Sequence, residues 1–409
     1  MPPAAIDILL FTGIAFSVGL FCYAAVVCYQ LLRTDAALPT ARAGIALADE
    51  KPPAHKLCII VPAHNEAGSI ATLIRSLKAQ DYDRLRVVLA LDRCTDDTRG
   101  VAERAIDRDP RFEIIEITEC PDDWAGKVHA AWSGYQRSQH AQSADALLFT
   151  DADTEFDPAC VRACLALASH RRLDMLSLFC TLRSELWFER VAQTAAGFEL
   201  VRQYPLIRAN LEDHTRRRPF ANGQFMLFDA GAYRAIGGHE SVKAALLEDI
   251  AFARVLTYRG MRTGLLRAEG LVTCNMYDTW AEFRKGWKRI YTESANRERG
   301  RLRRYALRAR LTGVVLPCIT IGALAAGLLT AGPLGIATAA IAAIALAAWV
   351  VSLALLYRRS GATLLDLPAF PIGAWLVGSI FREAWSDLVR GKPTSWGGRE
   401  YVRTPAARG

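Results

Sequence analysis

The sequence lacks the patterns that mark several common enzyme and binding classes. Its ten cysteines include no Cys-x-x-Cys pair, and Cys160 and Cys164 have no matching pair of histidines nearby, so a zinc site is not expected. No Gly-x-Gly-x-x-Gly follows the first expected strand, which argues against a dinucleotide-binding oxidoreductase. The Gly126-Lys127 step lacks the preceding glycine and the following Ser or Thr of a Walker motif. The scattered cysteines indicate reduced thiols in a reducing compartment.

Apolar residues make up 52% of the 409-residue chain and gather at its two ends. Residues 8–32 carry no charge, and this run exceeds the roughly 20 apolar residues that a membrane-spanning helix needs. No Lys or Arg precedes it, which favours a retained anchor over a cleaved signal peptide. The runs 311–331 and 334–357 predict a helical hairpin across the bilayer, and their length argues against a hairpin buried in a soluble core. Residues 364–381, interrupted by prolines, are expected to span, re-enter or lie in the interface.

Basic residues indicate the side of the membrane on which the middle of the chain lies. Arg33 follows the first apolar run, and a group of arginines precedes the second: Arg297, Arg299, Arg301, Arg303, Arg304, Arg308 and Arg310. The positive-inside tendency predicts a multi-pass protein of the cell (inner) membrane with a cytoplasmic middle domain. The formal net charge of +8 is then explained by contacts with membrane lipids, and no nucleic-acid partner is expected.

Between the apolar ends, short apolar strands alternate with helices. Strands are expected at 57–63, 86–92, 112–118 and 146–150, and helices at 66–80, 95–108 and 127–139. The alternation predicts an α/β fold with a mostly parallel sheet covered on both faces. Ligands of such sheets bind at the carboxyl ends of the strands, so the residues that follow each strand are the candidates for a functional site.

Two pairs of acidic residues are candidates for chemistry. Asp151 and Asp153 end the fourth expected strand, where both carboxylates can approach one hard cation; Mg²⁺ or Mn²⁺ prefers such oxygen ligands together with a substrate's phosphates. A solvated turn explains two such acids equally well in isolation, and only their position favours a metal. Glu248 and Asp249 open an amphipathic helix, where they either stabilise the helix dipole or supply a general base.

The order of these motifs resembles that of the inverting nucleotide-sugar glycosyltransferases of the GT-A fold. Within them it is most similar to the membrane-bound subgroup that includes hopanoid-associated and carotenoid glycosyltransferases. The resemblance covers nearly the whole chain and depends on an ordered set: Val61-Pro62, Trp124-Ala125-Gly126-Lys127, Asp151-Ala152-Asp153, Gly237-Gly238-His239-Glu240, Glu248-Asp249, Asn275-Met276-Tyr277 and Trp396-Gly397-Gly398-Arg399. It implies a Rossmann-like GT-A domain with transmembrane helices at the N- and C-terminal ends.

The resemblance also implies a role for individual residues. Those expected to hold the nucleoside are Pro62, Asn65, Glu66 and Asp92. Lys127 is expected at the diphosphate, Asp151 and Asp153 at the ribose and the metal, and Asp249 at the acceptor hydroxyl as the base. Glu248 is the rival base, and the further substrate-binding candidates are Gln224, Glu248 and Trp287.

Two departures from the family pattern narrow the prediction. Processive polysaccharide synthases of the same fold carry Arg before Trp where this chain has Gly286-Trp287, which favours a single sugar transfer, of a hexose. Leu91 stands where many relatives have another Asp, which leaves Asp92 to make the nucleoside contact alone; a UDP-sugar is the favoured donor. The alternatives are a processive synthase and a non-catalytic membrane scaffold that keeps the fold.

An aromatic stripe follows the middle domain. Its residues lie on one helical face, with Arg and Lys beside it: Trp280, Phe283, Trp287, Ile290, Tyr291 and Ser294. This pattern predicts an interfacial helix and hence a lipid-like acceptor; ordinary core packing is the alternative. The predicted organisation is an anchor (1–33), a linker (34–54), the GT-A catalytic domain (55–279), a basic amphipathic interfacial helix (280–310), C-terminal transmembrane or re-entrant helices (311–390) and a tail (391–409).

Overall fold

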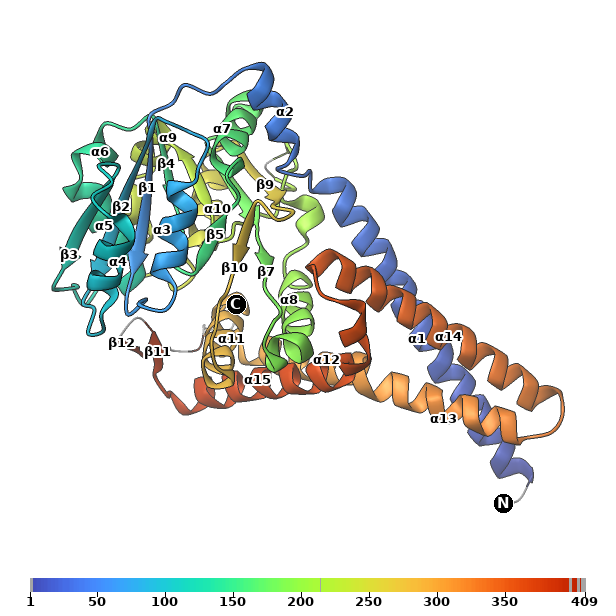
Figure 1. The fold of residues 1–409 in the computed structure, drawn as a ribbon. Helices are drawn as coiled ribbons and strands as arrows, with labels where there is room; N and C mark the ends of the chain where they lie inside the picture. The colour runs from blue at the N-terminus through green and yellow to red at the C-terminus, as the bar shows by residue number, and fades with distance from the viewer. Residues whose placement is uncertain (1–2, 214, 397–398, 403–404, 406–409) are drawn as a thin grey trace.

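A seven-stranded sheet forms the centre of the α/β domain in the computed structural model, which describes residues 3–213, 215–396, 399–402 and 405 (Figure 1). The strand order is β3-β2-β1-β4-β8-β6-β9. The strands are β1 (Leu57–Ala63), β2 (Leu85–Asp92), β3 (Phe112–Ile117), β4 (Ala146–Phe149), β6 (Met175–Phe179), β8 (Met226–Asp229) and β9 (Thr263–Arg267). Only β8 runs antiparallel to its neighbours β4 and β6. The predicted α/β class with a mostly parallel sheet is confirmed.

Alternate residues of β1 enter two separate hydrophobic cores, one on each face of the sheet. Leu57, Ile59 and Val61 pack under helices α3 (Ile70–Lys78), α4 (Thr98–Ile106) and α7 (Cys160–Arg171). Cys58 and Ile60 face the opposite side, under α5 (Gly126–Arg137), α9 (Ala230–Ala235) and α10 (Glu248–Tyr258). Because both faces are covered, the central strands β1 and β4 are continuously apolar rather than alternating.

The segment predicted as a linker, residues 34–54, is attached to the α/β domain. Helix α1 (Pro3–Ala37) continues into it, and α2 (Ala43–Glu50) packs on α7. A Cβ atom at residue 44 would collide with the carbonyl oxygen of Ala163. Because Gly44 has no side chain, α2 can lie directly against α7. The segment predicted to link the anchor to the domain thus also packs on it, through a contact between residues more than 100 positions apart in the sequence.

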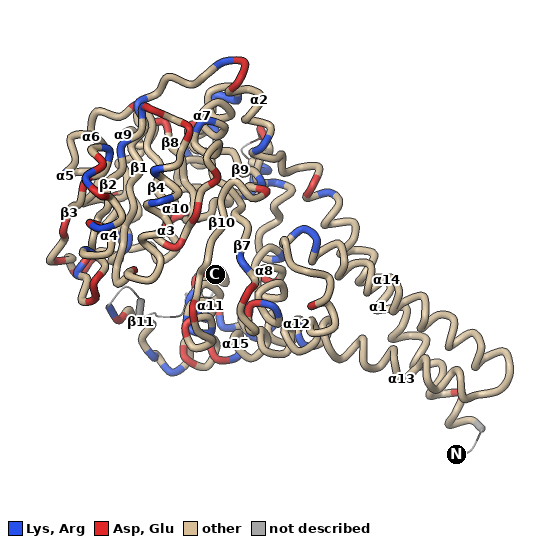
Figure 2. Tube along the Cα trace, in the orientation of Figure 1, with Lys and Arg blue, Asp and Glu red and all other residues tan. Residues whose placement is uncertain are grey.

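Three long apolar helices form a bundle that projects from the α/β domain (Figure 1). They are α1, α13 (Leu316–Leu329) and α14 (Pro333–Ser360), with α13 continuing α12 (Arg299–Arg310) through a π-helical turn. Figure 2 shows the outer part of this bundle almost bare of charge. By length and composition, four helices of the described chain can cross a membrane: Ala4–Ala37, Arg299–Leu329, Pro333–Ser360 and Leu364–Arg390.

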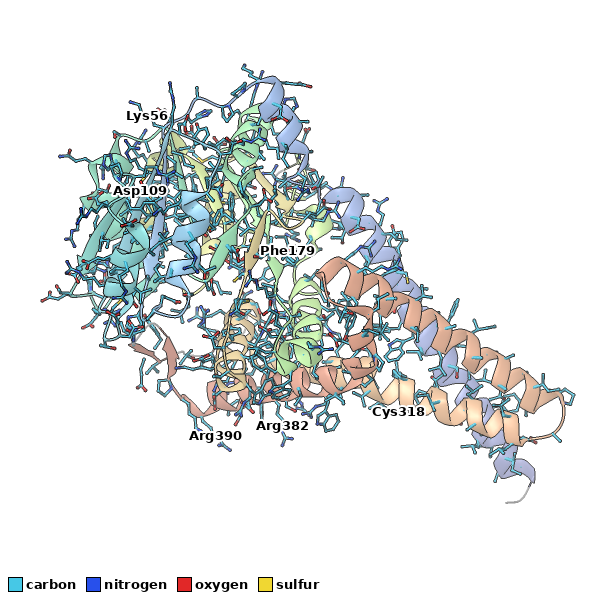
Figure 3. All side chains as sticks on the ribbon, viewed as in Figure 1. Lys56, Asp109, Phe179, Cys318, Arg382 and Arg390 are labelled. Carbon is cyan, nitrogen blue, oxygen red and sulfur yellow. The ribbon has the colours of Figure 1, made fainter. Side chains whose placement is uncertain are left out.

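The last of these helices follows a different course from the bundle. Helix α15 (Phe370–Arg390) runs under α8 (Thr194–Val201) and α11 (Trp280–Ser294), beside α12 (Figure 1). In Figure 3, Arg382 and Arg390 lie on its side away from α11. An apolar N-terminal half followed by exposed arginines is typical of a helix at a membrane interface.

The aromatic stripe of α11 faces protein. Phe283 and Tyr291 are fully buried, and the Tyr291 ring stacks on Phe381 of α15 with 3.8 Å between ring centroids. The neighbouring cations pair with the same helix: Arg284 lies 3.1 Å from Glu383, and Lys288 lies 2.6 Å from Asp387. The interpretation of the stripe as a bilayer-facing surface was therefore wrong, and the core-packing alternative holds.

A buried ionic network joins the α/β domain to the apolar helices. Glu199 of α8 is 4% exposed and lies 2.9 Å from Arg202 and 2.5 Å from Arg308 of α12. The Arg202 guanidinium also lies over the ring of Tyr23 of α1, 5.4 Å from its centroid. The Glu199 carboxylate is thus shared by two guanidinium groups at the point where three helices meet.

We expect Glu199→Gln to destabilise the protein because Arg202 and Arg308 would lose their shared counter-charge. Breaking a buried pair of this kind costs about 3 kcal/mol, which thermal unfolding in detergent would show as a lowered midpoint. Glu185→Gln, at an exposed carboxylate, is the matched control. Equal midpoints for the two variants would contradict the role assigned to the network.

Candidate active site

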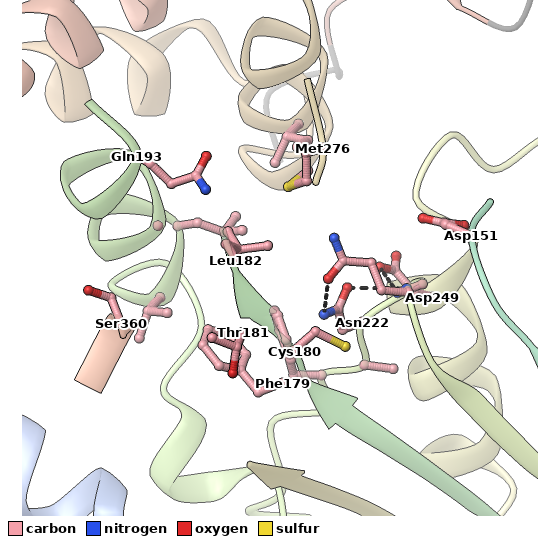
Figure 4. A pocket seen from close by; sticks show the side chains of 18 of the residues that line it. Asp151, Phe179, Cys180, Thr181, Leu182, Gln193, Asn222, Asp249, Met276 and Ser360 are labelled. Atoms are coloured by element: carbon pink, nitrogen blue, oxygen red, sulfur yellow. Dashed lines mark hydrogen bonds between the residues drawn. The ribbon is translucent and has the colours of Figure 1, made fainter. Parts of the chain in front are cut away.

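The carboxyl ends of the parallel strands open into one large cavity of about 1380 Å³ (Figure 4). Every predicted site residue lines it: Pro62, Asn65, Glu66, Asp92, Lys127, Asp151, Asp153, Gln224, Glu248, Asp249 and Trp287. They come from the ends of β1, β2 and β4, the starts of α5 and α10, the loop before β8, and α11. Residues spread over some 225 positions of the sequence thus share one site.

Lys127, in the first turn of α5, joins the two acidic motifs. Its Nζ lies 2.5 Å from Asp151 Oδ1 and 2.6 Å from Glu248 Oε1. Burial opposes the charged ammonium, but the two carboxylates outweigh it and raise the pKa of Lys127. In this structure the lysine predicted at the diphosphate is therefore a bridge between the acidic pair after β4 and the acidic pair that opens α10.

The two adjacent acids of α10 have opposite environments. Burial alone would raise the pKa of Glu248, but the contact with Lys127 outweighs it and the pKa is lowered. Asp249 accepts hydrogen bonds from the backbone N–H groups of Gly223, at 2.9 Å, and Ile250, at 2.7 Å. Burial, followed by the charge of Glu248, raises the pKa of Asp249 to about 7. Burial likewise raises the pKa of Glu66 to about 7, so Asp249 and Glu66 are the two cavity carboxylates with a pKa near neutrality, and of the acidic pair of α10 only Asp249 is one.

Gly223 leaves the space in which these groups meet. A Cβ atom at this position would lie 3.2 Å from Glu248 Oε1, 3.2 Å from Lys127 Nζ and 3.5 Å from Asp249 Oδ2. The glycine also donates its N–H to Asp249. The motif Asn222-Gly223-Gln224 therefore positions Asp249 through its backbone and leaves room for Lys127 beside Glu248.

The acid pair after β4 fits a divalent cation that a substrate completes. Asp153 Oδ1 is buried and has no hydrogen-bond partner among the described residues. Burial, then the charges of Asp151 and Glu66, raise the pKa of Asp153 well above its ordinary value. No group of three or more His, Cys, Asp or Glu side chains in the described chain is arranged to hold a metal. A coordination sphere made of two carboxylates, with the remaining oxygen ligands supplied by a substrate phosphate and water, suits Mg²⁺ or Mn²⁺.

The loops after β1 and β2 are tied together at the end of the cavity predicted to hold the nucleoside. Asn65 has a left-handed backbone, with φ of 58°, and its side-chain oxygen accepts the N–H of Thr95 at 2.7 Å. Asp92 is almost fully buried and forms two hydrogen bonds with the Arg93 guanidinium, at 2.6 and 2.8 Å. Asn65 and Asp92 therefore shape this end of the cavity as well as lining it.

Gln224 and Trp287 lie deeper in the cavity wall. Gln224 donates to Cys274 Sγ at 2.8 Å and accepts from Asn222 at 3.0 Å, so its amide is held by protein. The indole N–H of Trp287 is buried and finds no acceptor in the described chain. It is available to a bound ligand.

The structure explains the glycine that precedes Trp287. A Cβ atom at Gly286 would lie 2.0 Å from the Tyr277 hydroxyl and 2.3 Å from the adjacent ring carbon. Tyr277 therefore occupies the space that a larger residue, including the arginine of processive synthases, would need. This exclusion could not be read from the local sequence of α11 because Tyr277 lies outside that helix.

Several residues around the site were not predicted. His239 is buried beside Glu248 and Lys127, it shares a hydrogen bond with the Tyr233 hydroxyl at 2.8 Å, and burial lowers its pKa to about 3. The Tyr204 hydroxyl lines the cavity and is buried with no partner in the part of the chain described. His239 lies in a recognised motif, but Tyr204 stands in no motif that could have identified it.

The C-terminal hairpin, β11 (Thr394–Trp396) and β12 (Arg399–Tyr401), docks on the loop before α5. The N–H of Gly126 donates to the Tyr401 hydroxyl at 3.0 Å, and Arg399 lies 2.5 Å from Asp122. In the predicted motif of residues 396–399, Gly397 and Gly398 lie outside the described residues. The same holds for 403–404 and 406–409 of the predicted tail.

Comparisons with known proteins agree with this architecture. Residues 58–236 match the family described as glycosyl transferase family 2. This stretch holds β1 to α9, including Lys127 and the acid pair after β4, and ends just before the acidic pair of α10. The chain thus carries a glycosyltransferase domain, and the predicted enzyme class is confirmed. No curated protein sequence matches the chain.

Solved structures give distant likenesses. The mannosyltransferase PcManGT from Pyrobaculum calidifontis, in complex with GDP-Man and Mn²⁺, is 16% identical, with a TM-score of 0.46 over 92% of this chain and 98% of that one. TarS 1–349 of S. aureus, in complex with UDP-GlcNAc, is 13% identical, with a TM-score of 0.39 over 85% and 96%. Glucosyl-3-phosphoglycerate synthase from Mycobacterium tuberculosis is 17% identical, with a TM-score of 0.40 over 63% and 82%.

We expect Gly223→Ala to lower activity while the protein still folds. The methyl group would displace Lys127 or Glu248 by a few tenths of an ångström, and since a misplacement of about 1 Å can cost about a hundredfold in rate, we expect a loss of up to about tenfold. Gly300→Ala is the control because a Cβ atom there meets nothing within 4 Å. The rate of nucleoside diphosphate release measures the effect, and an unimpaired Gly223→Ala variant would refute the crowding argument.

Proposed function

We propose that the protein is an inverting, non-processive glycosyltransferase that moves one sugar from a nucleotide-sugar donor to an amphiphilic acceptor at the cytoplasmic face of the inner membrane. The observation that carries this is the division of labour within the acid pair of α10. Glu248 is held by Lys127, and Asp249 remains as a carboxylate with a pKa raised to about 7. Such a group matches the requirement for a general base at neutral pH.

The proposed reaction is a single displacement. The acceptor hydroxyl oxygen bonds to the anomeric carbon of the sugar as the bond from that carbon to the diphosphate oxygen breaks. Its proton passes to the Asp249 carboxylate, and the bonding electron pair leaves with the nucleoside diphosphate. Attack on the face opposite the leaving group inverts the anomeric carbon.

Asp151 and Asp153 would hold a divalent cation, Mg²⁺ or Mn²⁺, that neutralises charge on the departing diphosphate. Lys127, already 2.5 Å from Asp151, would place a further positive charge beside this site. Pro62, Asn65, Glu66 and Asp92 would then surround the nucleoside, with UDP favoured. The proposed metal ligands, the Lys127 ammonium and the proposed base all lie in one cavity. This arrangement supports an enzyme rather than a non-catalytic scaffold.

Two observations support a single transfer to a lipid. Tyr277 fills the space beside Gly286, so the arginine of processive synthases has no room. The cavity also reaches the ends of α1 and α14, helices long and apolar enough to span a membrane. Both agree with the membrane-bound subgroup that includes hopanoid-associated and carotenoid glycosyltransferases. The Arg-rich start of α12 supports the cytoplasmic orientation.

The proposal is tested by nucleoside diphosphate release from a panel of nucleotide sugars in detergent, with Mg²⁺ or Mn²⁺ and host lipid extract. We expect lipid-dependent release that Asp249→Asn lowers about a hundredfold to ten-thousandfold, since it removes the base. Asp153→Ala should abolish it through loss of the metal ligand, whereas Asp83→Asn, at an exposed site, should leave it unchanged. Full activity of either site variant, or no release from any donor with any lipid fraction, would overturn the proposal.

The pH dependence provides a second test. Because the Asp249 pKa is raised to about 7, the ionised base is lost as the pH falls through neutrality. The rate should therefore rise up to about pH 7 and level off above it. In Asp249→Asn the residual rate should not rise with pH in this way. The rates are measured at saturating donor between pH 5.5 and 8.5, roughly the range that brackets the pKa of this carboxyl group. An identical rise in the variant would assign it to another residue.

A further inference from the structure

The cavity extends well beyond the part that the predicted donor site needs. A site for one small ligand occupies roughly 300–1,000 Å³, and this cavity holds about 1380 Å³. In Figure 4, Asp151 and Asp249 lie at one side, and Gln193 and Ser360 lie at the other, beyond the segment from Phe179 to Leu182. The volume is sufficient for two reactants with their reacting groups near Asp249.

The far part of the cavity, here named the corridor, is formed at the boundary with the apolar helices. Its walls come from the end of α1 (30–38), from α8 and the turn after it (193–204), and from the end of α14 (355–361). Phe179, at the end of β6, lies between the sheet and this bundle (Figure 3) and lines the cavity where the corridor meets the donor site. The corridor thus joins the reacting groups to two candidate membrane spans.

Apolar side chains dominate the corridor where it meets these spans. They are Leu31, Phe198, Leu200, Val201, Leu355 and Leu356. Leu32 and Val351, on the outer surfaces of the same helices, are 57% and 55% exposed, so apolar surface continues outside the wall at this level. An apolar lining that continues into an apolar outer surface suits an alkyl chain that remains partly in the bilayer.

Polar atoms without partners lie along the corridor. Gln193 is 5% exposed, and its Oε1 has no hydrogen-bond partner among the described residues; the same is true of the Tyr204 hydroxyl. Leaving such an atom unsatisfied costs about 1–3 kcal/mol, which a hydroxyl of a bound ligand would offset. Tyr204 also lies close enough to Asp249 for that charge to add to burial in raising the Tyr204 pKa to about 12.

Two arginines that face the corridor, Arg359 and Arg202, pair with carboxylates, and Arg359 Nη1 is buried with no hydrogen-bond partner among the described residues. Arg359 of α14 lies 2.6 Å from Asp35 of α1, and Arg202 pairs with Glu199. Arg358 lies exposed at the rim. With acids at the donor end and paired cations at the membrane end, the corridor matches a neutral head group better than a phosphate.

We propose that the acceptor is a membrane lipid with a neutral, hydroxyl-bearing head group that enters the corridor from the bilayer at its membrane end, which the ends of α1 and α14 line. Its hydroxyl passes Gln193 and Tyr204 and reaches Asp249, while its alkyl chain lies between Leu31, Phe198 and Leu355. This proposal rests on the proposed function, because it supplies the acceptor for that transfer, and it uses the same displacement with the same proton acceptor.

The test measures whether a lipid-like molecule occupies the corridor, not whether sugar is transferred. A negative result would therefore count against the corridor and not against the proposed transferase activity. The full chain is placed in phosphatidylcholine nanodiscs with a long-chain alcohol that carries a photoreactive diazirine. After irradiation, labelled peptides are mapped, and long-chain alcohol without the diazirine serves as the competitor. We expect competed labelling of residues 193–204, which are shielded from the bilayer. Labelling confined to the outer faces of the spans would overturn the proposal.

Leu355→Trp should obstruct the corridor and weaken this labelling about tenfold. Val350→Trp, at a position of α14 that is 44% exposed and outside the cavity, is the matched control and should label as the parent does. Binding of free nucleoside diphosphate to each variant reports whether the α/β domain is folded. Unchanged labelling of a folded Leu355→Trp variant would contradict the corridor. Stronger labelling by an alkyl phosphate carrying the same diazirine would overturn the neutral head group.

Discussion

The contact of Lys127 with Asp151 and Glu248 is the interaction on which the arrangement of the site depends. It joins the start of α5, the turn after β4 and the start of α10, which are distant in the sequence. Each partner is at least partly desolvated, so the loss of Lys127 would leave two carboxylates without compensation, which costs more than the contact itself contributes to stability. The same contact separates the roles of the two adjacent acids, since the carboxylate that holds the lysine is not the one left to take a proton.

A second constraint fixes the position of the site relative to the apolar helices. Helices α8, α11 and α15 share a core with the ends of α1 and α14, and the ion pair of Arg359 with Asp35 joins those two ends. The α/β domain is therefore attached through packed side chains and not through a flexible segment. A domain held in this way can present its acidic groups at one depth, which suits an acceptor whose reactive group projects a fixed distance from the bilayer.

The sheet and most of the site could be predicted because their signals are local. The strands around β1 are continuous apolar runs that end in polar residues, and the topology of a parallel sheet brings such ends together. The packing of α2 on α7 and of the aromatic face of α11 on α15 could not be predicted because the partners, Ala163 and Phe381, are distant in the sequence. An amphipathic stripe has the same pattern whether it faces lipid or protein. Tyr204 and the hairpin at Tyr401 join the site through tertiary contacts alone.

The pair Gly286 and Tyr277 shows how one departure from a family pattern can have a structural cause. With 2.0 Å between a Cβ atom at residue 286 and the Tyr277 hydroxyl, even alanine would require the ring to move, and arginine would require its removal. Tyr277 lines the cavity beside Met276, so moving it would reshape the wall around the reactants. A single substitution toward the processive motif therefore cannot by itself recreate a polymer-binding surface; Tyr277 and its neighbours would have to change together with Gly286.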